Sequence, residues 1–129
     1  MPKSILPAIL DLMLDYIADE GDQLCICNAE PTTKTEADTT YMIAKSSVND
    51  ISATAPAAGI VSGRRITIPE NFAEGGALTI TNTDTATHVA IIDSVGGVLL
   101  YVTTCTPQAL TAAGSVTVPA WDIEMRNPT

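Results

Sequence analysis

The segment Thr87–Thr104, THVAIIDSVGGVLLYVTT, decides the fold class. Two runs rich in Val, Ile, Leu and Thr flank the triplet Val95-Gly96-Gly97, and in an extended chain His88, Ala90 and Ile92 alternate with Val89, Ile91 and Asp93. Such alternation is typical of strands, because successive side chains point to opposite faces of a sheet. A short connection with paired glycines is a common hairpin turn. The segment therefore predicts an antiparallel β-hairpin.

Similar short runs lie on both sides of this hairpin, and turn residues such as Glu30-Pro31, Gly75-Gly76 and Ala113-Gly114 separate them. Ala77–Asn82 is expected to be a further antiparallel neighbour of the hairpin. The pattern predicts a mainly β fold, an antiparallel β-sandwich or barrel of about seven to eight short strands. The expected strands are Gln23–Asn28, Thr39–Lys45, Arg64–Pro69, Ala77–Asn82, Thr87–Asp93, Val98–Thr104, Ser115–Pro119 and Trp121–Met125.

One N-terminal α-helix, at about residues 5–20, precedes the strands. Pro7 suits a first turn and Gly21 a helix end. Helical spacing places Asp11, Asp15 and Asp19 on one narrow, solvated face. The remaining apolar arc is wider than a surface helix needs. Two interpretations stay open: a helix wedged between the sheet and a loop, or a helix that also packs against another subunit through Ile9 and Met13.

The chain of 129 residues fits a single β-rich domain, residues 1–129, with the sandwich at about 23–126. Two connections are long. Residues 46–62 are rich in Ala, Ser and Gly, and residues 30–38 form a polar loop. Loops of this kind suit an extended surface element or a subunit arm.

The charge excludes several functions. A formal net charge of −9 argues against binding nucleic acid through phosphate neutralisation. No apolar run approaches the roughly 20 residues that span a bilayer, so no membrane partner is expected. The first residues lack the small-residue cleavage site of a signal peptide.

No catalytic or metal-binding pattern stands out. The three cysteines are expected to be reduced, buried small hydrophobes, which indicates folding in a reducing cytoplasm. His88 is the single histidine, and nothing in the sequence places a cysteine beside it. Asp122 and Glu124 alternate as solvent-facing charges would. We expect no enzyme activity, no metal and no cofactor.

Two features indicate contacts instead. Arg64-Arg65 is the single adjacent basic pair in an acidic chain. Pairing with an internal or intersubunit carboxylate is favoured over an edge-strand charge that discourages aggregation. The stretch Ser94–Trp121 contains no charged residue, and its neutral loop 106–115 would pack closely against a partner.

Three motifs carry a resemblance. Cys27–Ala37 has the pattern C-x-x-EPTT-x-TEA, Ser62–Arg65 reads SGRR, and Ala86–Ala90 reads ATHVA. In this order the chain resembles a family of small tailed-phage and prophage virion structural proteins along nearly its whole length. Val89 stands where that family usually has an aromatic residue.

The resemblance implies a phage virion structural protein. The leading hypothesis is a capsid decoration, or cement, protein that binds the outside of the assembled shell and stabilises contacts between capsomers. A tail, neck or spike component is the alternative, and a non-catalytic β-sandwich that binds carbohydrate or peptide is a further one. The expected partners are the major capsid protein and copies of the chain itself, with a trimer favoured. The expected location is the virion, after assembly in the bacterial host cytoplasm. Candidate interface residues are Arg64, Arg65, Glu30, Pro31, Thr32, Thr33, Ile9 and Met13.

Overall fold

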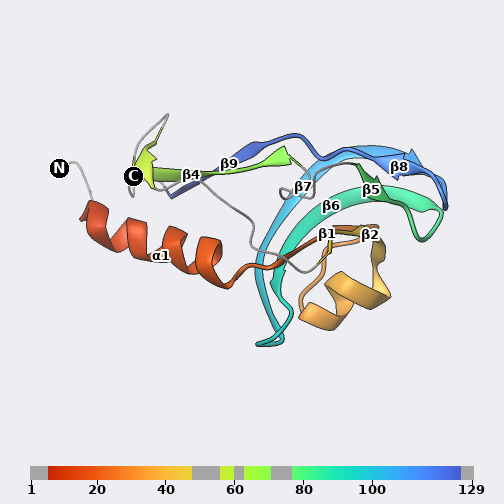
Figure 1. The fold of residues 1–129 in the computed structure, drawn as a ribbon, viewed down its shortest axis with the longest axis horizontal. Coiled ribbons are helices and arrows are strands. Elements are labelled where there is room, and N and C mark those ends of the chain that lie inside the picture. Colours follow the sequence, from red (N-terminus) through yellow and green to blue (C-terminus); the bar gives the residue numbers. More distant parts are fainter. Residues whose placement is uncertain (1–5, 48–55, 60–62, 71–76, 126–129) are drawn as a thin grey trace.

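The computed structural model describes residues 6–47, 56–59, 63–70 and 77–125. Within these ranges the chain forms an N-terminal helix, nine strands and one π-helical turn (Figure 1). In chain order they are α1 (Pro7–Glu20), β1 (Gln23–Cys27), η1 (Glu36–Thr40), β2 (Met42–Lys45), β3 (Ala57–Ala58), β4 (Arg64–Ile68), β5 (Leu78–Thr79), β6 (Asp84–Asp93), β7 (Val98–Leu110), β8 (Ser115–Val116) and β9 (Trp121–Met125).

The strands make three antiparallel sheets with the orders β2-β1-β6-β7, β3-β4-β9 and β5-β8. The predicted mainly β, antiparallel fold with one N-terminal helix is confirmed. Each of the eight predicted runs contains a strand, and β3 is an addition inside the predicted loop 46–62. The rest of that loop, residues 48–55 and 60–62, lies outside the described residues.

The predicted hairpin is β6–β7, the long curved pair in Figure 1. Its turn is fixed by Asp93, whose Oδ1 accepts hydrogen bonds from the backbone N–H groups of Val95 (3.1 Å) and Gly96 (2.8 Å). Gly97 has φ +71°, a conformation that glycine adopts without strain. Asp22, just before β1, accepts hydrogen bonds from both the N–H and the hydroxyl of Ser94. The turn is therefore tied to the start of the first strand.

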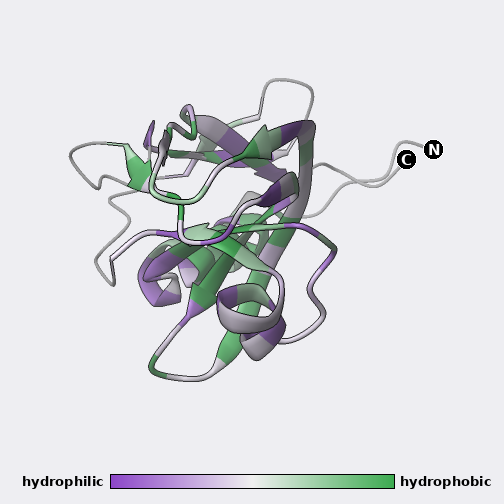
Figure 2. Cartoon of the chain, turned by 90° about the vertical axis from the view of Figure 1, so that its right-hand side faces the viewer, coloured by the Kyte–Doolittle hydropathy of each residue, from purple (hydrophilic) through white to green (hydrophobic). Residues whose placement is uncertain are grey.

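The four-stranded sheet is covered on both faces, because its alternating side chains enter two separate clusters. Leu24, Ile26 and Ile91 belong to the first core, which extends under α1 and the two smaller sheets. Cys25, Cys27, Ala90 and Ile92 belong to the second core, with Ala37 from η1. Figure 2 shows hydrophobic residues concentrated along the strands of this sheet.

The helix packs one flank on the β4–β9 side of the molecule. Leu10, Leu14 and Ile17 are buried there. A second apolar flank remains exposed, made by Leu6, Ile9, Leu12, Met13 and Tyr16. The helix thus covers its own sheet with only part of its apolar arc, and contact with another subunit stays a prediction.

The prediction of a strand over Thr39–Lys45 was wrong in its first half. Thr39 and Thr40 lie in the π-helical turn η1, and β2 begins at Met42. Isolated β-branched residues favour strands. Here the hydrogen bonds of the preceding turn hold the backbone in a helical conformation.

Two other expectations also need correction. Residues 106–110, expected to be part of a neutral loop, continue β7 to Leu110. Pro107 is accommodated because β7 is the last strand in the order and its pairing with β6 shifts between Ala86 and His88. Residues 77–82 are not a neighbour of the hairpin: β5 pairs with β8, and β6 lies between β1 and β7.

Candidate functional site

The arginine pair lies on β4, in the middle of the three-stranded sheet. Arg64 Nε is 2.7 Å from Asp11 Oδ1 on α1, and Arg65 Nη1 is 2.8 Å from Asp122 Oδ2 on β9. The predicted pairing with carboxylates is confirmed, and both partners lie in the same subunit. The edge-strand alternative is wrong because β3 and β9 flank β4. An additional interface role for either arginine stays a prediction.

These pairs also correct the view of the two carboxylates as solvated charges. Asp11 and Asp122 are half-buried. The Thr67 hydroxyl donates to Asp122 Oδ1 at 2.6 Å. That bond, followed by the bond from Arg65, lowers the pKa of Asp122. The carboxylates therefore fasten α1 and β9 to β4.

The segment Glu30–Thr33 leads into the turn η1. Glu30, Thr32 and Thr33 are exposed, and Pro31 is buried. Glu36 Oε1 accepts hydrogen bonds from the Thr32 N–H (2.9 Å) and the Thr32 hydroxyl (2.6 Å), while its own N–H donates to Thr33 Oγ1 (3.1 Å). This reciprocal arrangement resembles a capping box. The Thr32 bonds lower the pKa of Glu36.

The rest of this segment closes the second core. Ala37 is fully buried, and its carbonyl accepts a hydrogen bond from Cys27 Sγ at 3.4 Å. Lys34 Nζ lies 2.6 Å from Asp38 Oδ2. Burial opposes ionisation of Asp38, but the bonds from Lys34 and Thr39 prevail and lower its pKa. The side chains of the EPTT-x-TEA motif thus hold a cover over one face of the sheet.

The register brings His88 directly opposite Cys27 across β1 and β6. The sequence alone did not place a cysteine beside this histidine. Burial, followed by the nearby Cys105, raises the pKa of Cys27 to about 12. An activated cysteine needs the opposite shift. The raised pKa keeps the Cys27 thiol protonated, and His88 Nδ1 lies 2.8 Å from the Thr87 hydroxyl.

The cysteines match the prediction of reduced, mostly buried thiols. All three are free: Cys25 and Cys27 are buried, and Cys105 is half-buried. Burial raises the pKa of Cys25 to about 12 as well.

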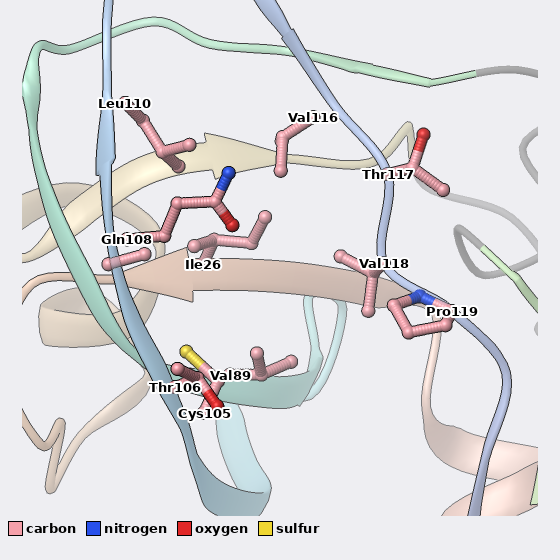
Figure 3. A pocket seen from close by; sticks show the side chains of 11 residues that line it. Ile26, Val89, Cys105, Thr106, Gln108, Leu110, Val116, Thr117, Val118 and Pro119 are labelled. Carbon is pink, nitrogen blue, oxygen red and sulfur yellow. The ribbon is translucent and has the colours of Figure 1, made fainter.

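The uncharged stretch Ser94–Trp121 lines both sides of a groove. Among the described residues no strand pairs with the outer edge of β7. Beside it lies a hollow of about 250 Å³. Figure 3 shows its walls: side chains of β7 on one side, residues 116–119 on the other, and Ile26 and Val89 between them. None of the lining side chains carries a charge.

A second hollow of about 230 Å³ adjoins the first, since both are lined by Val89, Cys105, Val118 and Pro119. Trp121 lines its end. In the described part of the chain, the buried Trp121 Nε1–H has no hydrogen-bond acceptor. The uncharged composition of Ser94–Trp121 indicated this region. The free edge of β7, the groove and the unpaired Trp121 N–H depend on which strands pair, and composition does not reveal strand pairing.

Over the described ranges, no group of three or more His, Cys, Asp or Glu side chains is placed to hold a metal ion. No helix in those ranges has the length and apolarity needed to cross a bilayer.

Comparisons of the chain with protein-family models, with curated proteins and with solved structures found no match in any of the three.

Proposed function

We propose that this chain is a structural protein of a tailed-phage particle, and specifically a capsid decoration protein. The observation that carries the proposal is the long, uncharged outer edge of β7 with an apolar groove beside it. An open strand edge offers backbone N–H and C=O groups to another chain, and an adjoining groove selects its side chains. The motif resemblance supplies the phage setting.

The mechanism is passive binding to an assembled surface. An extended segment of the major capsid protein adds to β7 and places small apolar side chains in the groove. A protein that binds the assembled shell and not the free subunits stabilises the shell by mass action. Copies at a symmetric capsomer junction form a trimer, in keeping with closed symmetry.

The motif residues support a structural role in a second way. Glu36 bonds to Thr32 within the EPTT-x-TEA motif, and Arg64 of the SGRR motif fastens α1 to the sheet. Their side chains hold covers in place over the two cores. A protein that must keep its shape within a particle requires contacts of this kind, so the motif residues support a structural role.

Shell binding by two matched lysine variants tests the role of the groove. Thr106 is exposed on β7 and lines the groove, whereas Thr81 is exposed away from it. We expect Thr106→Lys to lose binding to purified, undecorated shells, because an edge lysine opposes strand addition. Thr81→Lys is expected to bind like the wild type. Equal binding by the two variants, measured by co-sedimentation, would contradict the proposed groove.

The copy number in purified virions tests the position in the particle. A decoration protein is present in hundreds of copies, and a tail, neck or spike component in few. Quantitative gel densitometry against the major capsid protein separates these alternatives, and a low copy number would overturn the decoration role.

The groove also favours one other class of function. A non-catalytic module that binds a peptide would use the same strand edge and the same uncharged groove. Binding of uncharged extended peptides by the isolated protein, together with its absence from virions, would establish that alternative.

A further inference from the structure

The exposed flank of α1 carries regularly spaced apolar side chains that do not pack within their own subunit. Leu6, Ile9, Met13 and Tyr16 are separated by three, four and three residues, which is the a/d spacing of a coiled-coil seam. Their exposed fractions are 65%, 50%, 41% and 56%, and the adjacent Leu12 is 68% exposed. The buried residues Leu10, Leu14 and Ile17 lie on a different flank. The seam is therefore additional to the packing of the helix on its own sheet.

We propose that this seam pairs with the same seam of a second copy, with the two helices antiparallel. In an antiparallel coiled coil each a position faces a d position. Leu6 then faces Tyr16 of the second copy and Ile9 faces its Met13, and the two-fold axis crosses the seam midway between Ile9 and Met13. One patch thus matches itself, as an isologous contact requires.

The charges on the helix favour this direction. Asp19 and Glu20 are exposed in the last turn, where α1 has no basic residue, so they lie at the negative end of the helix dipole. In the antiparallel pair these carboxylates come just ahead of the positive first turn of the second copy. A parallel pair would instead bring the two acidic ends together. Asp11 lies on the opposite side of the helix, where Arg64 engages it, and adds no charge to the seam.

The contact is small. A seam of four to five side chains per copy is well below the roughly 20–30 residues on each side of a standard interface. We therefore expect weak, reversible pairing in dilute solution. In an array of bound copies the effective concentration is high, and the same contact would link neighbours. The pairing is a property of the purified chain and does not depend on the virion role.

Cysteine cross-linking tests both the seam and its direction. Ile9→Cys and Met13→Cys are made separately and oxidised at high protein concentration, alone and mixed. We expect the mixture to cross-link well above each single variant, because residue 9 of one copy faces residue 13 of the other. The wild type, which has three native cysteines, gives the background. Cross-linking of each single variant alone would indicate a parallel arrangement and overturn the proposal, as would a mixture at background.

Two glutamate variants provide a matched control. Ile9 and Ala8 are both exposed on α1, but Ala8 lies off the seam. Ile9→Glu is expected to weaken self-association about tenfold or more, and Ala8→Glu to leave it unchanged. Sedimentation equilibrium measures the association, and circular dichroism checks that both variants are folded. Equal association by the two variants would exclude the seam even if shell binding is intact.

Discussion

The two faces of the four-stranded sheet are closed in different ways. The first is covered by several separate elements, α1 and the two smaller sheets, and filled with large side chains such as Leu24, Ile43 and Ile91. The second is covered by the neighbouring segment 30–41 and filled with Cys25, Cys27, Ala37, Ala90 and Ile92. One face of the sheet thus has a large core under several elements, and the other has a small core under a single segment.

This difference indicates how the stability is distributed. Burial of large aliphatic side chains dominates the first face. On the second, small side chains leave little apolar area, and the cover depends on the bonds of Thr33, Glu36 and Asp38. We expect the second cover to open at a lower free energy than the first.

The largest expected effect is a difference in unfolding free energy between substitutions at two adjacent residues. Ile91 and Ile92 are both fully buried but enter the first and second core respectively. We expect Ile91→Ala to reduce the free energy of unfolding by about 4 kcal/mol and Ile92→Ala by about 2 kcal/mol, since a small core closed by a single local segment collapses more readily around a missing side chain. Urea denaturation measures both. An equal or larger loss for Ile92→Ala would contradict the comparison.

The next effect concerns the cap of the local cover. Thr33→Ala removes the Oγ1 acceptor of the Glu36 N–H and is expected to destabilise the segment by about 1 kcal/mol. Thr35→Ala is the control, because Thr35 makes no side-chain cap bond. Hydrogen exchange of residues 32–41 should accelerate in the first variant alone. Similar acceleration in both would mean that the cap bond does not hold the cover.

A smaller effect is expected from the ion pair that fastens the first cover. The side chains of Arg64 and Asp11 are 27% and 28% exposed, so solvent weakens their attraction. Arg64→Met is expected to cost up to about 1 kcal/mol of unfolding free energy, and the cost should shrink in about 1 M salt. Salt titration of wild type and variant checks this. A cost independent of salt would assign the effect to lost packing of the arginine stem instead.

The smallest expected effect is a pH dependence of the second cover. Hydrogen bonds from Thr32 lower the pKa of Glu36 below its ordinary value of about 4.3. A lowered pKa in the folded state adds stability above the ordinary value, and that stability is lost as pH falls through the folded pKa. The protection of the Thr32 amide, measured against the intrinsic exchange rate at each pH, should therefore fall below about pH 4. Glu36→Gln should largely remove this dependence, and an unchanged profile would contradict the role of the carboxylate.

The features that local pattern encodes were predictable. Alternation in residues 88–93 and the paired glycines at 96–97 identified the β6–β7 hairpin, and Pro7 and Gly21 bounded the helix closely. Thr39 and Thr40 were misassigned because single-residue preference favours a strand, while the bonds of Thr33 and Glu36 hold the preceding turn. A T-x-x-E capping pattern at 33–36 was the signal that could have prevented the error.

Features that depend on long-range pairing were not predictable. The pairing of β5 with β8 and the insertion of β6 between β1 and β7 join segments far apart in sequence. For the same reason the groove beside β7 and the partner of Arg64 were not identified in advance. The exposed seam was found in part, at Ile9 and Met13. The heptad spacing that adds Leu6 and Tyr16 was visible in the sequence, but the sequence did not show that these side chains are exposed.

The strand order also determines how the chain can fold. β1 pairs with β6, which begins more than fifty residues later, and the Asp22–Ser94 bonds close the same long loop. Loop-closure entropy must be overcome before that pairing contributes, so contact order predicts folding in milliseconds to seconds. The β6–β7 hairpin is local and can form first. During synthesis, the edge of β1 that pairs with β6 therefore stays unpaired until the β6–β7 hairpin has left the ribosome.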